Sequence, residues 1–212
     1  LLGIKIEKAQ LAWKQWRFVS FDEKAALLRR TAMVLRTRKE KLATLMALEM
    51  GKPLKDGQAE VEKCAGVCEY YADNGAVYLA DQMVSTEASK SYIAYQPLGI
   101  VLAIMPWNFP FWQVFRFVAP GLMAGNCGLL KHASNVPGCA LAIEEVLLEA
   151  GFPAHVFQTL LIDSKATRKV IEHPQVRAVT LTGSTEAGMQ VAQQAAGLLK
   201  KSVLELGGSD AY

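Results

Sequence analysis

Short apolar runs alternate with longer segments of helical periodicity through the second half of the chain. We expect strands at residues 100–105, 128–131, 156–162, 176–182 and 202–206. We expect helices between them at residues 112–124, 138–150, 165–172 and 185–200. The strands are apolar without interruption, which is typical of parallel strands that helices cover on both faces. The pattern therefore predicts an α/β fold built on a Rossmann-like, doubly wound parallel sheet.

The first third of the chain has helical periodicity throughout. Ser20 and Glu23 have the spacing of a capping box, which predicts a helix that begins just after Ser20. A second helix is expected at residues 39–50, where Gly51 gives a stop signal. A third is expected at residues 58–79. We expect these helices to pack against the sheet and to have a structural role.

Composition and charge exclude several classes of function. The chain has 212 residues, of which 51% are hydrophobic, so it can bury one large core or two small ones. A net charge of +3 is too small to favour nucleic acid or an anionic membrane as a partner. The basic residues between positions 29 and 41 are interpreted as a solvated helix face rather than a polyanion site. No apolar run approaches the roughly 20 residues of a membrane span, and no secretory signal is visible, so we expect a cytoplasmic protein.

The four cysteines favour buried, free thiols in a reducing compartment. They are Cys64, Cys68, Cys127 and Cys139, and no paired histidines lie at the spacing of a zinc site. We therefore expect no metal. Cys127 opens an apolar run and has no base beside it in the sequence, so a core thiol is favoured over a nucleophile.

Two polar groups stand where predicted strands give way to turns, which is where catalytic groups tend to lie in open α/β sheets. Asn108 lies between Pro106 and Pro110, and its amide is suited to hold an oxyanion. Glu205 ends the last strand before a glycine pair; we expect it to be partly desolvated, with a raised pKa that suits a general base. The alternatives are a turn-forming asparagine and a solvated strand-end glutamate. A nucleophile is still required.

Two further strand ends are candidate sites for an anion. The turn that begins at Gly183 lacks the middle glycine of G-x-G-x-x-G, so Ser184 is either a helix cap alone or a cap plus a phosphate site. Lys131 ends an apolar strand, where it either points to solvent or needs an anionic or hydroxyl partner.

These motifs together resemble the aldehyde dehydrogenase superfamily. The resemblance rests on residues 49–53, 98–101, 106–110, 130–131, 182–186 and 205–208, which occur in the family's order and approximate spacing. Complete members are more than twice as long, so the resemblance implies an N-terminal portion that ends before the catalytic cysteine. It implies N-terminal helices at 1–82, an oligomerisation arm of β-strands at 83–98 and an NAD(P)-binding sheet at 99–212, with the catalytic domain absent. The alternating segment 91–96 fits this arm or an ordinary edge strand.

The resemblance also implies roles for individual residues. Asn108 would hold the oxyanion and Glu205 would activate the deacylating water. Residues implied to contact the cofactor, NAD or NADP, are Met105, Trp107, Asn108, Lys131, His132, Ala133, Ser134, Gly183, Ser184 and Leu206. His132 is interpreted as a ribose or phosphate neighbour or a half-buried ring. Ser134 replaces a family glutamate that repels a 2′-phosphate, so we expect NADP to be tolerated. The family's adenosine-site glycine is missing from segment 158–165.

The expected reaction is oxidation of an aldehyde to a carboxylic acid by a homodimer or homotetramer. Within the family, the motifs at Met105, Lys131 and Glu205 are most similar to those of bacterial succinate-semialdehyde dehydrogenases. The nucleophile would lie beyond residue 212, so we expect these residues alone to be inactive. Two alternatives stay open: a non-enzymatic NAD(P)-binding or oligomerisation module, and a CoA- or phosphate-linked aldehyde dehydrogenase, against which Glu205 counts.

Overall fold

The computed structural model describes residues 2–209, and its N-terminal third is helical. The helices are α1 (Leu2–Trp16), α2 (Phe21–Thr37), α3 (Lys39–Met50) and α4 (Leu54–Tyr78). The predicted capping box is confirmed, because Ser20 Oγ accepts a hydrogen bond from the Glu23 N–H at 3.2 Å and the Glu23 carboxylate accepts from the Ser20 N–H. Gly51 ends α3 with a left-handed φ of 74°. The third helix begins at Leu54 rather than at residue 58, directly after Pro53.

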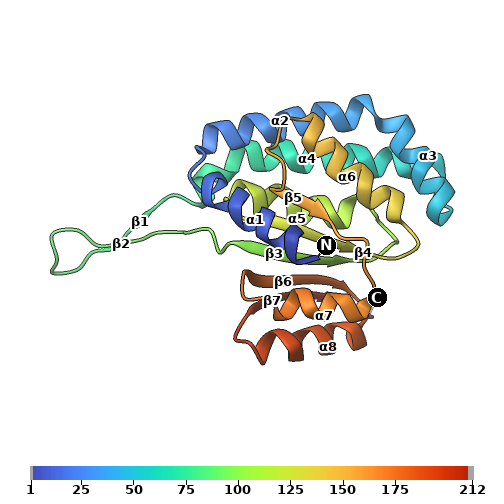
Figure 1. Ribbon diagram of the computed structural model, residues 1–212. Coiled ribbons are helices and arrows are strands. Elements are labelled where there is room, and N and C mark those ends of the chain that lie inside the picture. Colours follow the sequence, from blue (N-terminus) through green and yellow to red (C-terminus); the bar gives the residue numbers. More distant parts are fainter. Residues whose placement is uncertain (1, 210–212) are drawn as a thin grey trace.

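A narrow two-stranded ribbon follows the helices and leaves the body of the molecule (Figure 1). It consists of β1 (Gln82–Met83) and β2 (Tyr92–Ile93), which pair antiparallel with each other and with no strand of the main sheet. Both strands are exposed. The segment is therefore not an edge strand of the main sheet, and the predicted strand at 91–96 is shorter than expected.

The main sheet confirms the predicted doubly wound parallel architecture. Its strands are β3 (Ile100–Met105), β4 (Cys127–His132), β5 (Phe157–Thr159), β6 (Val176–Gly183) and β7 (Lys201–Leu206), in the order β5-β4-β3-β6-β7. All neighbours are parallel. The strand expected at 156–162 is reduced to β5, because the chain leaves this sheet edge toward Asp163, which caps the next helix through the Ala166 N–H.

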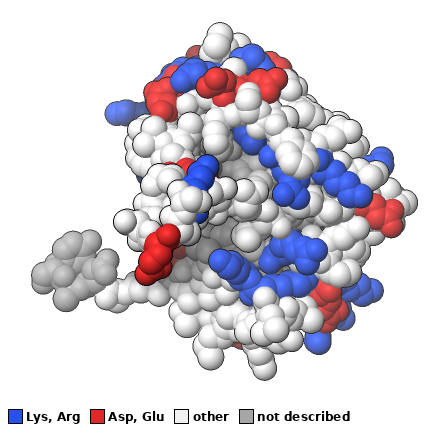
Figure 2. Space-filling view, turned by 90° about the vertical axis from the view of Figure 1, so that its left-hand side faces the viewer, with Lys and Arg blue, Asp and Glu red and all other residues white. Residues whose placement is uncertain are grey.

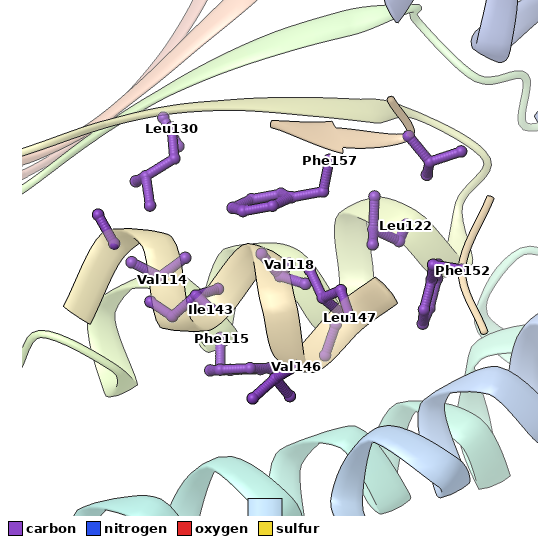
Figure 3. Packing of buried hydrophobic residues seen from close by; sticks show 14 of the residues in the cluster. Val114, Phe115, Val118, Leu122, Leu130, Ile143, Val146, Leu147, Phe152 and Phe157 are labelled. Carbon is purple, nitrogen blue, oxygen red and sulfur yellow. The ribbon is translucent and has the colours of Figure 1, made fainter. Parts of the chain in front are cut away.

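Helices cover the sheet on both sides, as Figure 1 shows. They are α5 (Trp112–Met123), α6 (Pro137–Glu149), α7 (Ser164–Glu172) and α8 (Thr185–Ala196). The helix expected at 185–200 ends at Ala196, before Gly197. One part of the core lies where α5 and α6 meet β4 and β5, and Phe115, Ile143 and Phe157 are all nearly or fully buried there (Figure 3). The same core continues onto α1–α4. This packing fixes the carboxyl ends of the strands.

Charged groups on the surface are largely interleaved. At the top of the face in Figure 2 acidic and basic side chains lie side by side, while basic side chains are in the majority lower on that face. Three arginines of the basic segment form ion pairs: Arg29 with Asp73 at 2.7 Å, Arg36 with Glu62 at 2.7 Å and Arg38 with Glu145 at 2.9 Å. These pairs support the interpretation of a solvated helix face. Within residues 2–209 no helix is both long and apolar enough to cross a membrane.

Candidate active site

The predicted site residues lie at the carboxyl ends of the parallel strands. The chain runs outward from β3 through β4 to β5 and then returns to place β6 on the other side of β3. The strand order therefore reverses between β3 and β6, and this is the point where open α/β sheets bind their ligands. The Asn108 turn follows β3 here, Lys131 and His132 end β4, Gly183 ends β6, and Glu205 lies near the end of β7.

The Asn108 turn presents its side chain to solvent. The backbone carbonyl of Asn108 accepts a hydrogen bond from Lys52 Nζ at 2.8 Å, and Asn108 Oδ1 accepts one from the Phe109 N–H at 3.1 Å. No described group within residues 2–209 accepts a hydrogen bond from the Asn108 side-chain amide. The backbone and the amide oxygen are thus held while the amide N–H groups stay available to a ligand, which is what an oxyanion donor requires.

His132 is buried and braces the same turn. Its Nε2 lies 2.8 Å from the carbonyl oxygen of Pro110, and its Nδ1 accepts a hydrogen bond from the Ala133 N–H at 2.9 Å. The Pro110 contact requires a proton on Nε2, and Nδ1, which also lies 3.2 Å from the Met105 carbonyl oxygen, would carry a second proton only in the charged ring. Burial lowers the pKa of His132, which keeps the ring neutral. The ring therefore ties β4 to the Asn108 turn, and it is more buried than the sequence predicted.

The neutral His132 ring predicts a loss of stability in mild acid. The unfolded chain takes up a proton below the ordinary histidine pKa of about 6.5, and the folded ring resists it, so stability falls as the pH falls through that value. Thermal melts of the full-length protein between about pH 7.5 and pH 5.5 should show a smaller acid shift of Tm for His132→Gln than for the unsubstituted protein. Equal shifts in both proteins would contradict this assignment.

Glu205 forms an ion pair with Arg116 of α5. Half of the Glu205 side chain and 30% of the Arg116 side chain are exposed. The Arg116 hydrogen bond and charge lower the pKa of Glu205, so the expectation of a desolvated carboxylate with a raised pKa is wrong for this arrangement. Val203 and Leu206 next to it are also exposed. The apolar run that precedes Glu205 therefore does not bury it.

The Arg116–Glu205 pair predicts how the rate of a reaction that uses Glu205 as its general base depends on pH. Because Arg116 stabilises the ionised carboxylate, Arg116→Met should raise the pKa of Glu205 toward its ordinary value. We expect the acid limb of the pH profile of kcat/KM to move to higher pH in Arg116→Met. The substrate to use is one without a carboxylate, so that only the ionisation of Glu205 is affected. An acid limb at the same pH in both proteins would contradict the prediction.

The turn after β6 is a helix cap and a tight junction. Ser184 Oγ accepts a hydrogen bond from the Ala187 N–H at 3.2 Å, which confirms the cap. Gly188 lies so close to the Leu206 side chain that a Cβ there would overlap it. In dinucleotide-binding turns the last glycine has this role, because it lets the helix approach the strand. Gly183 and Ser184 therefore sit at a helix N-terminus of the kind that attracts anions.

A hollow of about 290 Å³ opens beside the ends of β4 and β5. Its lining includes His132, Ala133, Ser134, Leu160 and Asp163. Lys131, just before it, is half-buried, and no ion pair or side-chain hydrogen bond of Lys131 is found within residues 2–209. The hollow and this lysine leave polar groups free for a ligand at the expected place. Leu160, Leu161 and Ile162 also line the hollow, and no glycine lies in this segment.

The two proposed catalytic groups line different hollows. Asn108 lines one of about 500 Å³ together with Lys52, Glu60 and Phe109. Glu205 lines another of about 420 Å³ together with Arg116, Met105 and Thr182. Trp107 is half exposed, and Met105 is buried at the end of β3. The described residues therefore place Asn108 and Glu205 at the same carboxyl end of the sheet, but the two side chains line separate pockets.

The cysteines are confirmed as free and buried. Burial raises the pKa of Cys127 to about 12, so its thiol is not ionised near neutral pH. Burial also raises the pKa of Cys64, Cys68 and Cys139. No group of three metal-ligating side chains is found in the described part of the chain.

Sequence reasoning missed three polar residues that hold the candidate catalytic groups. Arg116 is the charged residue of the largely apolar helix α5, and it pairs with Glu205. Lys52 and Glu60 form a buried ion pair under the Asn108 turn. Lys52 belongs to the motif at residues 49–53 that carried the resemblance, which was a usable signal. Glu60 had none beyond its place among buried residues of α4.

Comparison with known proteins decides the family. The profile of the aldehyde dehydrogenase family matches residues 4–212. The chain belongs to the aldehyde dehydrogenase family. A relative in Synechocystis sp., a probable succinate-semialdehyde dehydrogenase [NADP(+)], is 56% identical over 100% of this chain and 46% of its own length. Succinate-semialdehyde dehydrogenase [NADP(+)] 1 of Mycobacterium tuberculosis is 48% identical over 98% of this chain and 46% of its own length.

Solved structures of this family share the architecture. The crystal structure of succinic semialdehyde dehydrogenase from Streptococcus pyogenes, in complex with NADP+, has a TM-score of 0.96 and 39% identity. The match covers 100% of this chain and 47% of that one. This aldehyde dehydrogenase chain thus spans about half the length of the relatives that it matches.

Proposed function

We propose that this chain is the cofactor-binding part of an NADP-dependent aldehyde dehydrogenase that oxidises succinate semialdehyde. One observation carries the proposal: Asn108, whose side-chain amide is available, and Glu205, whose carboxylate pairs with an arginine, both lie at the carboxyl end of the sheet. They lie on either side of the topological switch point, where dinucleotides bind in such sheets. The names of the relatives support the same substrate and cofactor. NADPH formation at 340 nm by the full-length protein with succinate semialdehyde is the direct test; no absorbance change with NADP+ or NAD+ would contradict it.

The chemistry follows from what each side chain can do. A cysteine thiolate of the full-length protein adds to the aldehyde carbon and forms an oxyanion. The Asn108 amide donates a hydrogen bond to that oxyanion. The cofactor, which Lys131, Ser134, Gly183 and Ser184 would hold, would supply the hydride acceptor for oxidation of this adduct to a thioester. Glu205 takes a proton from the water that attacks the thioester, so the water oxygen ends in the product acid and the thiol is released.

Arg116 fits the distal carboxylate of the substrate. Its guanidinium already pairs with one carboxylate, Glu205, at the wall of the 420 Å³ hollow. Arginine binds carboxylates through paired, charge-assisted hydrogen bonds. A substrate carboxylate there would share the guanidinium and loosen its hold on Glu205. The base would then regain proton affinity once the substrate is bound.

Removing the Arg116 charge should impair the acidic substrate selectively. We expect Arg116→Met to lower kcat/KM for succinate semialdehyde by about a hundredfold, the loss typical of a broken charge pair. The same variant should change kcat/KM for butyraldehyde, which lacks the carboxylate, by less than about threefold at a pH where Glu205 is ionised. Arg168→Met, which breaks an exposed ion pair with Glu172 on α7, is the matched control. Equal losses on both aldehydes would contradict the assignment.

The cofactor proposal rests on the hollow beside β4 and on the β6 turn. The Gly183–Ser184 turn would bind the pyrophosphate, and Lys131 with Ser134 would bind the adenosine ribose and its 2′-phosphate. Ser134 carries no charge, so nothing at that position repels a phosphate. The other residues of the proposed cofactor site are Met105, Trp107, Asn108, His132, Ala133 and Leu206. We propose that NADP is used and that NAD is also accepted.

A glutamate at Ser134 should select against NADP. We expect Ser134→Glu to raise the Kd for NADP+ by at least about tenfold, because a like charge then faces the 2′-phosphate. The Kd for NAD+ should change little or fall, since the new carboxylate can accept from both ribose hydroxyls. Fluorescence titration of both cofactors measures this. Wild-type discrimination of more than about a hundredfold against NADP, or equal effects of the substitution on both cofactors, would contradict it.

The proposed organisation assigns a role to each segment. Residues 1–82 would support the sheet, residues 83–98 would form an arm to a second subunit, and residues 99–212 would bind the cofactor. Residue 1 and residues 210–212 lie outside the described residues. The exposed, isolated β1–β2 ribbon supports the arm, because a two-stranded ribbon is marginally stable alone in water. A homodimer or homotetramer is the expected assembly, and light scattering of the protein with residues 84–91 replaced by a short turn tests it.

A further inference from the structure

A buried ion pair lies beneath the Asn108 turn. Lys52 Nζ contacts the Glu60 carboxylate, and only 8% and 2% of the two side chains are exposed. Removing two charges from water is costly, and a buried pair is often no more stabilising than apolar residues of the same volume. Stability is therefore a weak reason for this pair, and its other contacts are more informative.

Both partners use their remaining hydrogen-bonding capacity on one short stretch of backbone. Lys52 Nζ donates to the Asn108 carbonyl oxygen at 2.8 Å and lies 4.0 Å from the centre of the Phe109 ring. Glu60 Oε1 accepts from the N–H groups of Phe111 at 2.8 Å and Trp112 at 2.9 Å. The two side chains therefore hold the turn at its start and at its end.

The turn depends on these contacts because it has little support of its own. Helix α5 begins without a side-chain cap from its N-cap residue, Phe111, so Glu60 supplies the missing acceptor. Trp107, Asn108 and Phe109 are each exposed. A displacement of about 1 Å at a catalytic group can cost about a hundredfold in rate. A donor on such a turn needs a fixed backbone.

We propose that Lys52 and Glu60 are positioning residues that fix the Asn108 amide for oxyanion binding. This inference rests on the proposed function, since it takes Asn108 as the donor. The pair reaches no reacting atom itself; it acts on the peptide units around Asn108. Lys52 fixes the position of the Asn108 carbonyl, and Glu60 fixes the first turn of α5, into which the loop leads.

The test is a double-mutant cycle in the full-length protein. Glu60→Gln keeps an acceptor for the two N–H groups but leaves Lys52 without its counter-charge. We expect it to lower kcat by about ten- to a hundredfold, with KM for NADP+ changed by less than about twofold. In an Asn108→Ala background, where there is no amide to position, Glu60→Gln should lower kcat by less than about twofold.

Two further variants serve as a replacement for Glu60→Gln, should that variant not fold, and as a control. Lys52→Met combined with Glu60→Gln removes both charges at similar volume, so it should fold if Glu60→Gln does not, and it should lower kcat in the same Asn108-dependent way. Glu172→Gln breaks an exposed ion pair with Arg168 and should leave kcat unchanged. Circular dichroism and Tm identify variants that fail to fold.

The outcomes separate the two proposals. If Glu60→Gln and the double variant lower kcat by the same factor with and without the Asn108 amide, the pair does not act through Asn108 and this inference is overturned alone. If neither variant lowers kcat, it is also overturned. If Asn108→Ala keeps wild-type kcat, the oxyanion role of Asn108 fails and this inference fails with it.

Discussion

Replacing Glu205 by glutamine in the full-length protein will lower steady-state kcat by about a hundred- to ten-thousandfold, the usual contribution of a general base. Deacylation needs the base to take a proton from water, whereas hydride transfer does not. A stopped-flow trace at 340 nm should therefore keep a burst of about one NADPH per active site before the slow phase. Glutamine preserves the shape of the side chain and a hydrogen bond to Arg116, so the loss reports the missing base.

Glu186→Gln is the matched control for this substitution. Glu186 is exposed in the first turn of α8, two residues after the Ser184 cap, and the proposed mechanism gives it no role. We expect wild-type burst and steady-state rates for it. If Glu205→Gln also had wild-type turnover, or if it lost the burst and the steady-state rate to the same extent, Glu205 would not be the deacylating base.

Replacing Asn108 by alanine will slow the burst itself by about a hundred- to a thousandfold, the cost of removing one oxyanion donor. The reason is that thiolate addition and hydride transfer both pass through the oxyanion. Binding of NADP+ should change little, because the Asn108 backbone remains in place. Single-turnover rates with saturating NADP+ measure the effect.

The control for Asn108→Ala is an asparagine with an ordinary structural contact. Asn74 donates its side-chain amide to the Tyr70 carbonyl at 2.9 Å on α4, and Asn74→Ala should leave the single-turnover rate unchanged. An Asn108→Ala protein with a wild-type burst, or one whose burst is normal while only deacylation is slow, would contradict the oxyanion role.

Local chemistry made most of the fold predictable. The Ser20–Glu23 capping box and the left-handed Gly51 mark helix ends through contacts within a few residues, so both were visible in the sequence. The uninterrupted apolar runs predicted the parallel sheet because its strands are covered on both faces. Two predicted ends were misplaced although their signals are local. The strand at β5 stops early because the chain turns to cap α7, and α8 stops at Gly197.

The sequence predicted the individual residues of the candidate site but not the side chains that contact them. Asn108 and Glu205 stood out because each is a polar residue at the point where an apolar strand gives way to a turn. Their partners come from distant segments: Lys52 lies 56 residues before Asn108, and Glu60 lies 51 residues before Phe111. The lowered pKa of Glu205 depends on Arg116 of another helix. Hydrophobic periodicity cannot predict such pairs, because only the folded topology brings their two residues together.

The acyl intermediate of the Glu205→Gln protein tests the central claim most directly. The full-length variant is mixed with NADP+ and succinate semialdehyde, quenched in acid during turnover and examined by intact-protein mass spectrometry. If Glu205 activates the water that hydrolyses a thioester formed at this site, a succinyl adduct on a cysteine should approach one per chain in the variant and persist far longer than in the unsubstituted protein. Equally low adduct in both proteins, with turnover retained, would contradict the account.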